Sequence, residues 1–313
     1  MGTFTIEGRA APALFVIGWL ATILGGGILF IGYQAARSTF TSILILSGLA
    51  LLSLGLISAA GSQAIERRAR GAAYTGPSPF LLLAAAVAVG STLASIVLLP
   101  IRLVGLDASG PGANLVALAV IQLTYLGLIR LLVVGTGALS WAEMGVQPGG
   151  GRIARDLAWG AMFALPVLAV TLVLASIVSS LTSAVPESPL PATGSPGGLI
   201  LNLLGGAVLV PIGEELLFRG VATTAWARVY GPARAIIQGG LFFAVVHVLD
   251  IAGSVPEQAI ALAFVAFVTR IPVALTLGWI FQARRSLWAS VGLHAAFNGI
   301  LLVLAEVIRR ASV

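Results

Sequence analysis

The feature that most constrains the fold of this sequence is a series of long apolar runs separated by short polar segments. A membrane-spanning helix needs roughly 20 apolar residues, and nine runs approach that length, the seventh being short. Only 9% of the 313 residues are charged, against about 25% in soluble domains. We therefore predict an all-α, polytopic transmembrane bundle of eight or nine helices. The runs lie at 11–33, 40–61, 80–105, 114–138, 157–182, 198–222, 235–250, 259–282 and 287–308.

The basic residues, all of them arginine, orient this bundle. Most fall in alternate connecting segments, and cytoplasmic segments of membrane proteins carry the excess of basic residues. We therefore expect a cytoplasmic N-terminus, a retained first helix and a location in a prokaryotic inner membrane. Nine helices would leave Arg309 and Arg310 outside, so either the count is eight or the last helix tolerates the violation. We interpret the net charge of +6 as a signal of orientation and expect no nucleic-acid partner.

Two parts of the chain are expected to differ in role. Residues 1–156 would form four helices and a cytoplasmic loop, with no distinctive motif. Residues 157–313 would form the helices that carry chemistry. The chain has no cysteine, which excludes disulfides and thiolate metal sites. The expected partners are membrane lipid and a peptide or membrane-protein substrate.

The sixth apolar run carries three charged residues within six positions, which is costly inside a bilayer and needs a reason. Glu215 and Arg219 are four residues apart, so they share one face of a helix, with the acid before the base. Glu214 points about 100° away from that pair. One carboxylate can thus be held by an arginine while its neighbour faces a cavity.

Both histidines of the protein lie in later apolar runs. His247 lies near the end of the seventh run, and His294 precedes Asn298 by one helical turn in the last run. If helix directions alternate, both histidines lie at a depth comparable to that of Glu214. Such a set suits hydrolysis, because a carboxylate can act as a general base toward water. Histidine can orient the water, bind a metal or protonate a leaving amine, and an amide can stabilise an oxyanion.

Three short motifs in this order resemble the CPBP (ABI) family of intramembrane proteases. That family includes the Rce-type CAAX prenyl endopeptidases and bacterial proteins linked to bacteriocin immunity. The resemblance covers roughly residues 198–300. Its motifs stand here as Glu214-Glu215…Arg219, Phe243…His247 and His294…Asn298.

The resemblance implies an intramembrane endopeptidase and a role for each residue. Glu214 would activate water beside His247, while His294 and Asn298 would form an oxyanion site. Glu215 and Arg219 would mainly support the architecture. Accounts of the family divide between a metal-free glutamate mechanism and a metalloprotease. If a zinc ion is bound, the candidate ligands are Glu214, His247 and His294.

Plainer interpretations exist for the same residues. Glu215 and Arg219 suit a structural ion pair, and Asn298 or a single histidine suits an interhelical hydrogen bond. For the whole protein, one alternative is a non-catalytic member of the same fold that serves in immunity or as a scaffold. A proton-coupled transporter would also place glutamate and histidine within the membrane, but the chain shows no evident internal repeat.

Overall fold

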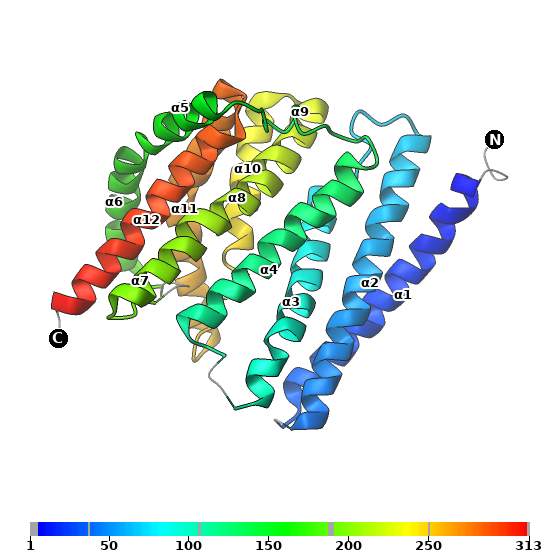
Figure 1. Cartoon of the computed structure of the whole chain (residues 1–313), viewed down its shortest axis with the longest axis horizontal. Coiled ribbons are helices and arrows are strands. Elements are labelled where there is room, and N and C mark those ends of the chain that lie inside the picture. Colours follow the sequence, from blue (N-terminus) through cyan, green and yellow to red (C-terminus); the bar gives the residue numbers. More distant parts are fainter. Residues whose placement is uncertain (1–5, 37, 106–107, 187–190, 250, 312–313) are drawn as a thin grey trace. The chain divides into compact units, whose positions relative to one another are not determined.

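The computed structural model describes residues 6–36, 38–105, 108–186, 191–249 and 251–311, with no side-chain detail for residues 6–10. Every regular element in these ranges is helical, as Figure 1 shows. The all-α prediction is therefore confirmed. The chain divides into two compact units, Met1–Ser140 and Trp141–Val313.

The first unit consists of four long apolar helices. Close contact between α1 and α2 depends on glycine: a Cβ atom on Gly55 would lie 2.4 Å from the backbone nitrogen of Thr22. Ser53 on α2 and Thr92 on α3 share a hydrogen bond of 3.0 Å between their hydroxyl groups. Such small and weakly polar contacts are typical of helices that pack within a membrane. The elements are α1 (Ile6–Gln34), α2 (Thr39–Ala69), α3 (Pro79–Leu103), α4 (Pro111–Ile129) and the π-helical turn η1 (Arg130–Val134).

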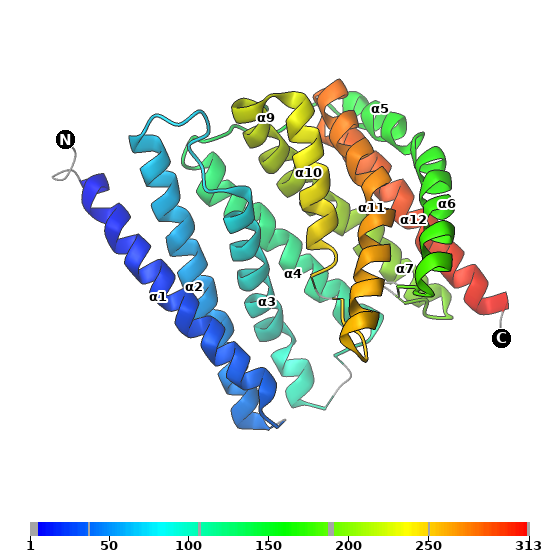
Figure 2. The same cartoon turned by 180° about the vertical axis from the view of Figure 1, so that it is seen from behind.

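The second unit contains the remaining helices and two further π-helical segments. Within it α10 lies beside α11, which Figure 2 shows from behind. The elements are α5 (Gly150–Ala161), α6 (Ala164–Thr182), α7 (Pro196–Leu203), η2 (Leu204–Leu209), α8 (Val210–Glu215), η3 (Leu216–Thr223), α9 (Thr224–Tyr230), α10 (Pro232–Val246), α11 (Pro256–Arg284) and α12 (Leu287–Ala311).

Eight helical stretches of the described chain are long and apolar enough to cross a membrane. The stretch from α7 to α9 counts as one of them, Pro196–Tyr230. The seventh predicted run, 235–250, corresponds to α10, a shorter apolar helix of 15 residues. The predicted count of eight or nine thus reflects how α10 is counted, and the protein is an integral membrane protein.

Residues 140–156, which we expected to be a loop, contain the first half of α5. This helix has one buried face and one exposed face, with Asp156 and Gly160 buried and Arg152 and Arg155 exposed. A Cβ atom on Gly160 would lie 1.9 Å from the carbonyl oxygen of Ala289, so glycine is required where α5 meets α12. Glycine has a low helical propensity, but packing on α12 stabilises the helix that begins at Gly150.

The main apolar core of the second unit joins α6, α11 and α12. Leu277 and Ile280 on α11 and Leu293 on α12 are fully buried in it. Leu293 immediately precedes His294, so this packing fixes the part of α12 that carries a predicted site residue. The other buried members are Ala164, Val167, Leu168, Val273, Ala289 and Phe297.

Candidate active site

Glu214 and Glu215 end the short α-helix α8, which lies between two π-helical segments. A π turn contains one more residue than an α turn and is found often at functional sites. In η3 every residue is buried, and Thr223 donates a hydrogen bond of 2.9 Å to the carbonyl oxygen of Phe218, five residues earlier. The side-chain hydroxyl thus satisfies a backbone acceptor in the widened turn. The two glutamates therefore project from a stretch of helix that is tied down on both sides.

Glu215 is buried and is held through one of its two carboxylate oxygens. The Oε1 atom of Glu215 accepts hydrogen bonds from Nη1 of Arg219 at 3.0 Å and from Nδ1 of His294 at 2.8 Å. The other oxygen, Oε2, has no hydrogen-bond partner among the described residues. Arg219 is equally buried, and its Nη2 atom donates to the carbonyl oxygen of Ala274 at 3.1 Å. The predicted pairing of Glu215 with Arg219 is present, and it extends to a histidine on another helix.

Glu214 has a different environment, although it is the adjacent residue. Its Oε2 atom lies 3.6 Å from Nε2 of His247 and 3.9 Å from Nε2 of His294. Both separations exceed an ordinary hydrogen bond, and this buried oxygen has no hydrogen-bond partner among the described residues. The Glu214 side chain is 17% exposed and that of His247 is 25% exposed. The Oε2 atom of Glu214 and the Nε2 atoms of His247 and His294 are therefore available to bind a small polar molecule.

His247 is oriented by the backbone one turn before it. Its Nδ1 atom lies 2.8 Å from the carbonyl oxygen of Phe243. A carbonyl oxygen only accepts, so Nδ1 carries the hydrogen of this bond, and Nε2 faces Glu214.

The Phe243 ring touches three members of the site. Its centroid is 4.2 Å from that of His247 and 5.7 Å from that of His294, and it lies 4.6 Å from Cζ of Arg219. We did not include Phe243 among the predicted site residues. Its position in the Phe243…His247 motif was the available signal, because residues four apart are neighbours on a helix.

Asn298 lies apart from these contacts. Its Nδ2 atom donates a hydrogen bond of 2.9 Å to the carbonyl oxygen of Gly206 in η2. Among the described residues, no hydrogen bond or ion pair joins Asn298 to a glutamate or histidine of the site. The structure thus brings together five of the six predicted residues. Asn298 instead connects α12 to η2.

The metal interpretation receives no support from the arrangement of side chains. The described part of the chain contains no group of three or more His, Cys, Asp or Glu residues arranged to hold a metal ion. The candidate ligands Glu214, His247 and His294 therefore do not form such a group. We therefore derive no chemical step through a metal.

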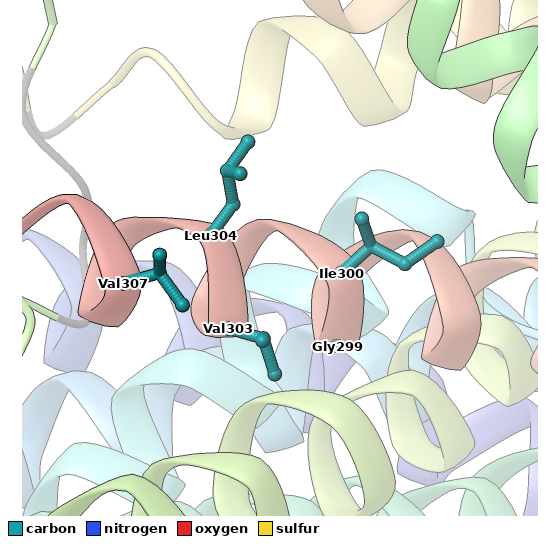
Figure 3. A pocket seen from close by; sticks show the side chains of 5 residues that line it. All are labelled: Gly299, Ile300, Val303, Leu304 and Val307. Carbon is teal, nitrogen blue, oxygen red and sulfur yellow. The ribbon is translucent and has the colours of Figure 1, made fainter.

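An apolar groove of about 320 Å³ begins on α12 one residue after Asn298. Figure 3 shows the side chains that line it along one helix. It contains no titratable side chain, so the proposed chemistry lies elsewhere. The lining residues are Gly299, Ile300, Val303, Leu304 and Val307.

A comparison with known families agrees with this geometry. Residues 196–300 match the model of the type II CAAX prenyl endopeptidase Rce1-like family. No curated protein and no solved structure matches the chain. The match begins at α7, ends within α12 and includes all six predicted site residues. It supports a protease embedded in the membrane, and the match of residues 196–300 agrees with the family resemblance that the three motifs predicted.

Proposed function

We propose that the protein is an intramembrane endopeptidase that hydrolyses a peptide bond with water activated by Glu214. The observation that carries this proposal is the contrast between two adjacent carboxylates. Glu215 is held through its Oε1 atom by Arg219 and His294, while Glu214 directs its unpaired Oε2 atom toward two imidazole nitrogens. A general base needs such an oxygen within reach of water and substrate.

In the proposed reaction, a water molecule lies between Glu214 and His247. One hydrogen points to the carboxylate and the other to Nε2 of His247, so an oxygen lone pair faces the peptide carbonyl carbon. As the carbon–oxygen bond forms, Glu214 takes the proton. The carbonyl becomes an oxyanion, and the amide nitrogen leaves with the proton that Glu214 took from water. The products are a new carboxyl group and a new amine.

Glu215 and His294 would act together at the oxyanion. The bond between Glu215 and Nδ1 of His294 fixes the plane of the ring, in the way that a carboxylate orients a catalytic histidine. In the protonated ring, Nε2 donates a hydrogen bond toward the developing negative charge. Arg219 holds Glu215 in place and touches no reacting atom in this scheme.

Asn298 would complete the oxyanion site. Its amide nitrogen carries two hydrogens, and Gly206 accepts one of them. The second hydrogen remains for the oxyanion, and the bond to Gly206 limits where it can point. One oxyanion donor contributes about 10²–10³-fold in kcat, which sets the effect expected for its removal.

The experiment that tests this function is a search for cleavage products with purified protein in detergent. A quenched peptide library is incubated with wild type and with Glu214→Gln, with and without a chelator, and the new termini are sequenced by mass spectrometry. Internal cleavage by wild type alone supports the endopeptidase, and loss of cleavage with the chelator would assign a role to metal. Identical background from both folded proteins would favour the non-catalytic partner of the same fold.

A further inference from the structure

A buried ion pair joins α5 to the end of α11. Asp156 is 1% exposed, and its Oδ1 atom accepts a hydrogen bond of 2.7 Å from Nη2 of Arg284. Its Oδ2 atom lies 3.7 Å from Nε of Arg152. Because Asp156 is on α5 and Arg284 is in the last turn of α11, this pair places the two elements side by side. Figure 1 shows α5 at the same end of the second unit as the turn between α11 and α12.

Two exposed arginines flank this pair, one on each element. Arg155 lies on the exposed side of α5, directly before Asp156 in the sequence. Arg285 is exposed and lies directly after Arg284. Neither Arg155 nor Arg285 has an ion pair or side-chain hydrogen bond with the described residues. Arg284 offsets the charge of Asp156, so the surface formed by Arg152, Arg155 and Arg285 is positively charged.

Arg285 also occupies a backbone conformation that glycine normally supplies. It ends α11 with φ 46° and ψ 42°, in the left-handed region. Helices commonly end in this conformation with glycine, because a side chain is disfavoured there. An arginine at this position therefore gives up some backbone stability and gains a charge at the helix end.

An aromatic cluster lies beside this charged surface. The ring centroid of Trp159 is 4.8 Å from that of Phe163 and 6.2 Å from that of Trp279, and Cζ of Arg284 lies 5.0 Å from the Trp159 ring. Trp279 is 46% exposed. Tryptophan is enriched where a membrane meets water, so the cluster places the arginines at the depth of lipid headgroups.

We propose that the surface formed by Arg152, Arg155 and Arg285 binds the phosphate headgroup of an anionic phospholipid. The guanidinium groups donate hydrogen bonds to the phosphate oxygens, and the aromatic cluster contacts the upper part of the acyl chains. The bound lipid would join α5 to the α11–α12 turn and so stabilise the start of α12. This inference is independent of the proposed hydrolysis.

The test is lipid retention by the purified full-length protein in neutral detergent, measured by native mass spectrometry. Palmitoyl-oleoyl phosphatidylglycerol and the matching phosphatidylcholine are offered at equal concentration to wild type and to Arg155→Gln/Arg285→Asn. Asparagine tolerates the left-handed conformation, so this change removes the charge and keeps the turn. The matched control is Arg68→Gln/Arg102→Gln, which removes two exposed arginines from the first compact unit.

We expect wild type and the control to retain phosphatidylglycerol in preference to phosphatidylcholine. The double variant should lose that preference by roughly fivefold for each arginine removed, the usual gain of a basic residue at an anionic membrane surface. Equal retention by all three proteins, or an equal loss in the control, would overturn the proposal. If the double variant does not fold, Arg155→Gln alone against Arg155→Lys decides the matter, because only the lysine variant should retain the lipid.

Discussion

At the scale of single residues, Glu214 and Glu215 are the same amino acid in adjacent positions with opposite surroundings. Glu215 is 0% exposed and shares one oxygen between Arg219 and His294. Glu214 lies next to the two histidine Nε2 atoms without a hydrogen bond to its Oε2. We therefore expect Glu215 to matter for folding and Glu214 for turnover.

The Glu215→Gln variant should be strongly destabilised. It leaves the guanidinium of Arg219 buried without its hydrogen-bonded carboxylate, and breaking a buried pair from one side costs about 3–5 kcal/mol. Glu214→Gln, which breaks no such pair, should lose less than about 1 kcal/mol. Unfolding of both variants in detergent, followed by circular dichroism, measures the difference. Equal stabilities would show that Glu215 is not the structural carboxylate.

Phe243→Leu should lower the cleavage rate of the folded protein about tenfold. The leucine keeps the carbonyl that binds His247 but removes the ring that packs on both histidines and on Arg219. Aromatic and cation–π contacts contribute about 0.5–2 kcal/mol each, and about 1.4 kcal/mol corresponds to tenfold in rate.

Phe242→Leu is the matched control for this change. Phe242 is buried next to Phe243 but packs on Phe218 and Trp226, with centroids 5.1 Å and 5.5 Å away. It should retain most of the cleavage activity. If both leucine variants lose the same activity, the effect comes from general packing and not from orientation of the histidines.

At the scale of elements, the contact between α5 and α12 depends on glycine on both helices. A Cβ atom on Gly292 would lie 2.1 Å from the carbonyl oxygen of Leu157, nearly as close an approach as the one at Gly160. Gly160→Ala should therefore push the helices apart and cost about 1–3 kcal/mol by overpacking. Thermal unfolding checks this against Gly151→Ala, where a Cβ atom meets nothing within 4 Å. An unchanged Gly160→Ala protein would contradict the observed packing.

Sequence patterns predicted the elements better than the geometry between them. The apolar runs predicted the long helices, and the four-residue spacing predicted the pair of Glu215 and Arg219. The π-helical segments left no periodic signal, because a single extra residue in a turn does not disturb an apolar run. The bond between Glu215 and His294 joins residues 79 positions apart, and only tertiary packing determines such a distance. The sequence did not predict the first half of α5, because that helix is stabilised by packing on α12 and not by its own residues.

At the scale of the whole molecule, the structure offers a reason why the end of α12 tolerates two arginines. Arg310 pairs with the buried Glu306 at 3.1 Å, and Arg309 donates to the carbonyl oxygen of Ala192. Glu306 also accepts a hydrogen bond of 2.9 Å from the backbone of Thr193. The charge at this end is thus partly compensated, which weakens the objection to nine membrane crossings.

Cysteine labelling can test the membrane orientation that a cytoplasmic N-terminus and nine crossings predict. Because α12 has 25 residues and rises about 1.5 Å per residue, it is long enough to cross the membrane. Its C-terminal end would then lie on the side of the membrane opposite to α5. The natural chain has no cysteine, so Gly151→Cys and Ala311→Cys each introduce a unique site. An impermeable maleimide added to intact cells should label residue 311 and leave residue 151 unlabelled until the cells are opened. Labelling of both from one side would contradict this topology.

The most direct test of the central claim is the initial rate of cleavage by Glu214→Gln relative to wild type. It uses the best peptide from the library and preparations matched for folding. We predict a rate about 10²–10⁴-fold lower, the usual contribution of a general base, with peptide binding unchanged. A rate within about tenfold of wild type, from a folded Glu214→Gln protein, would show that Glu214 is not the base that activates water.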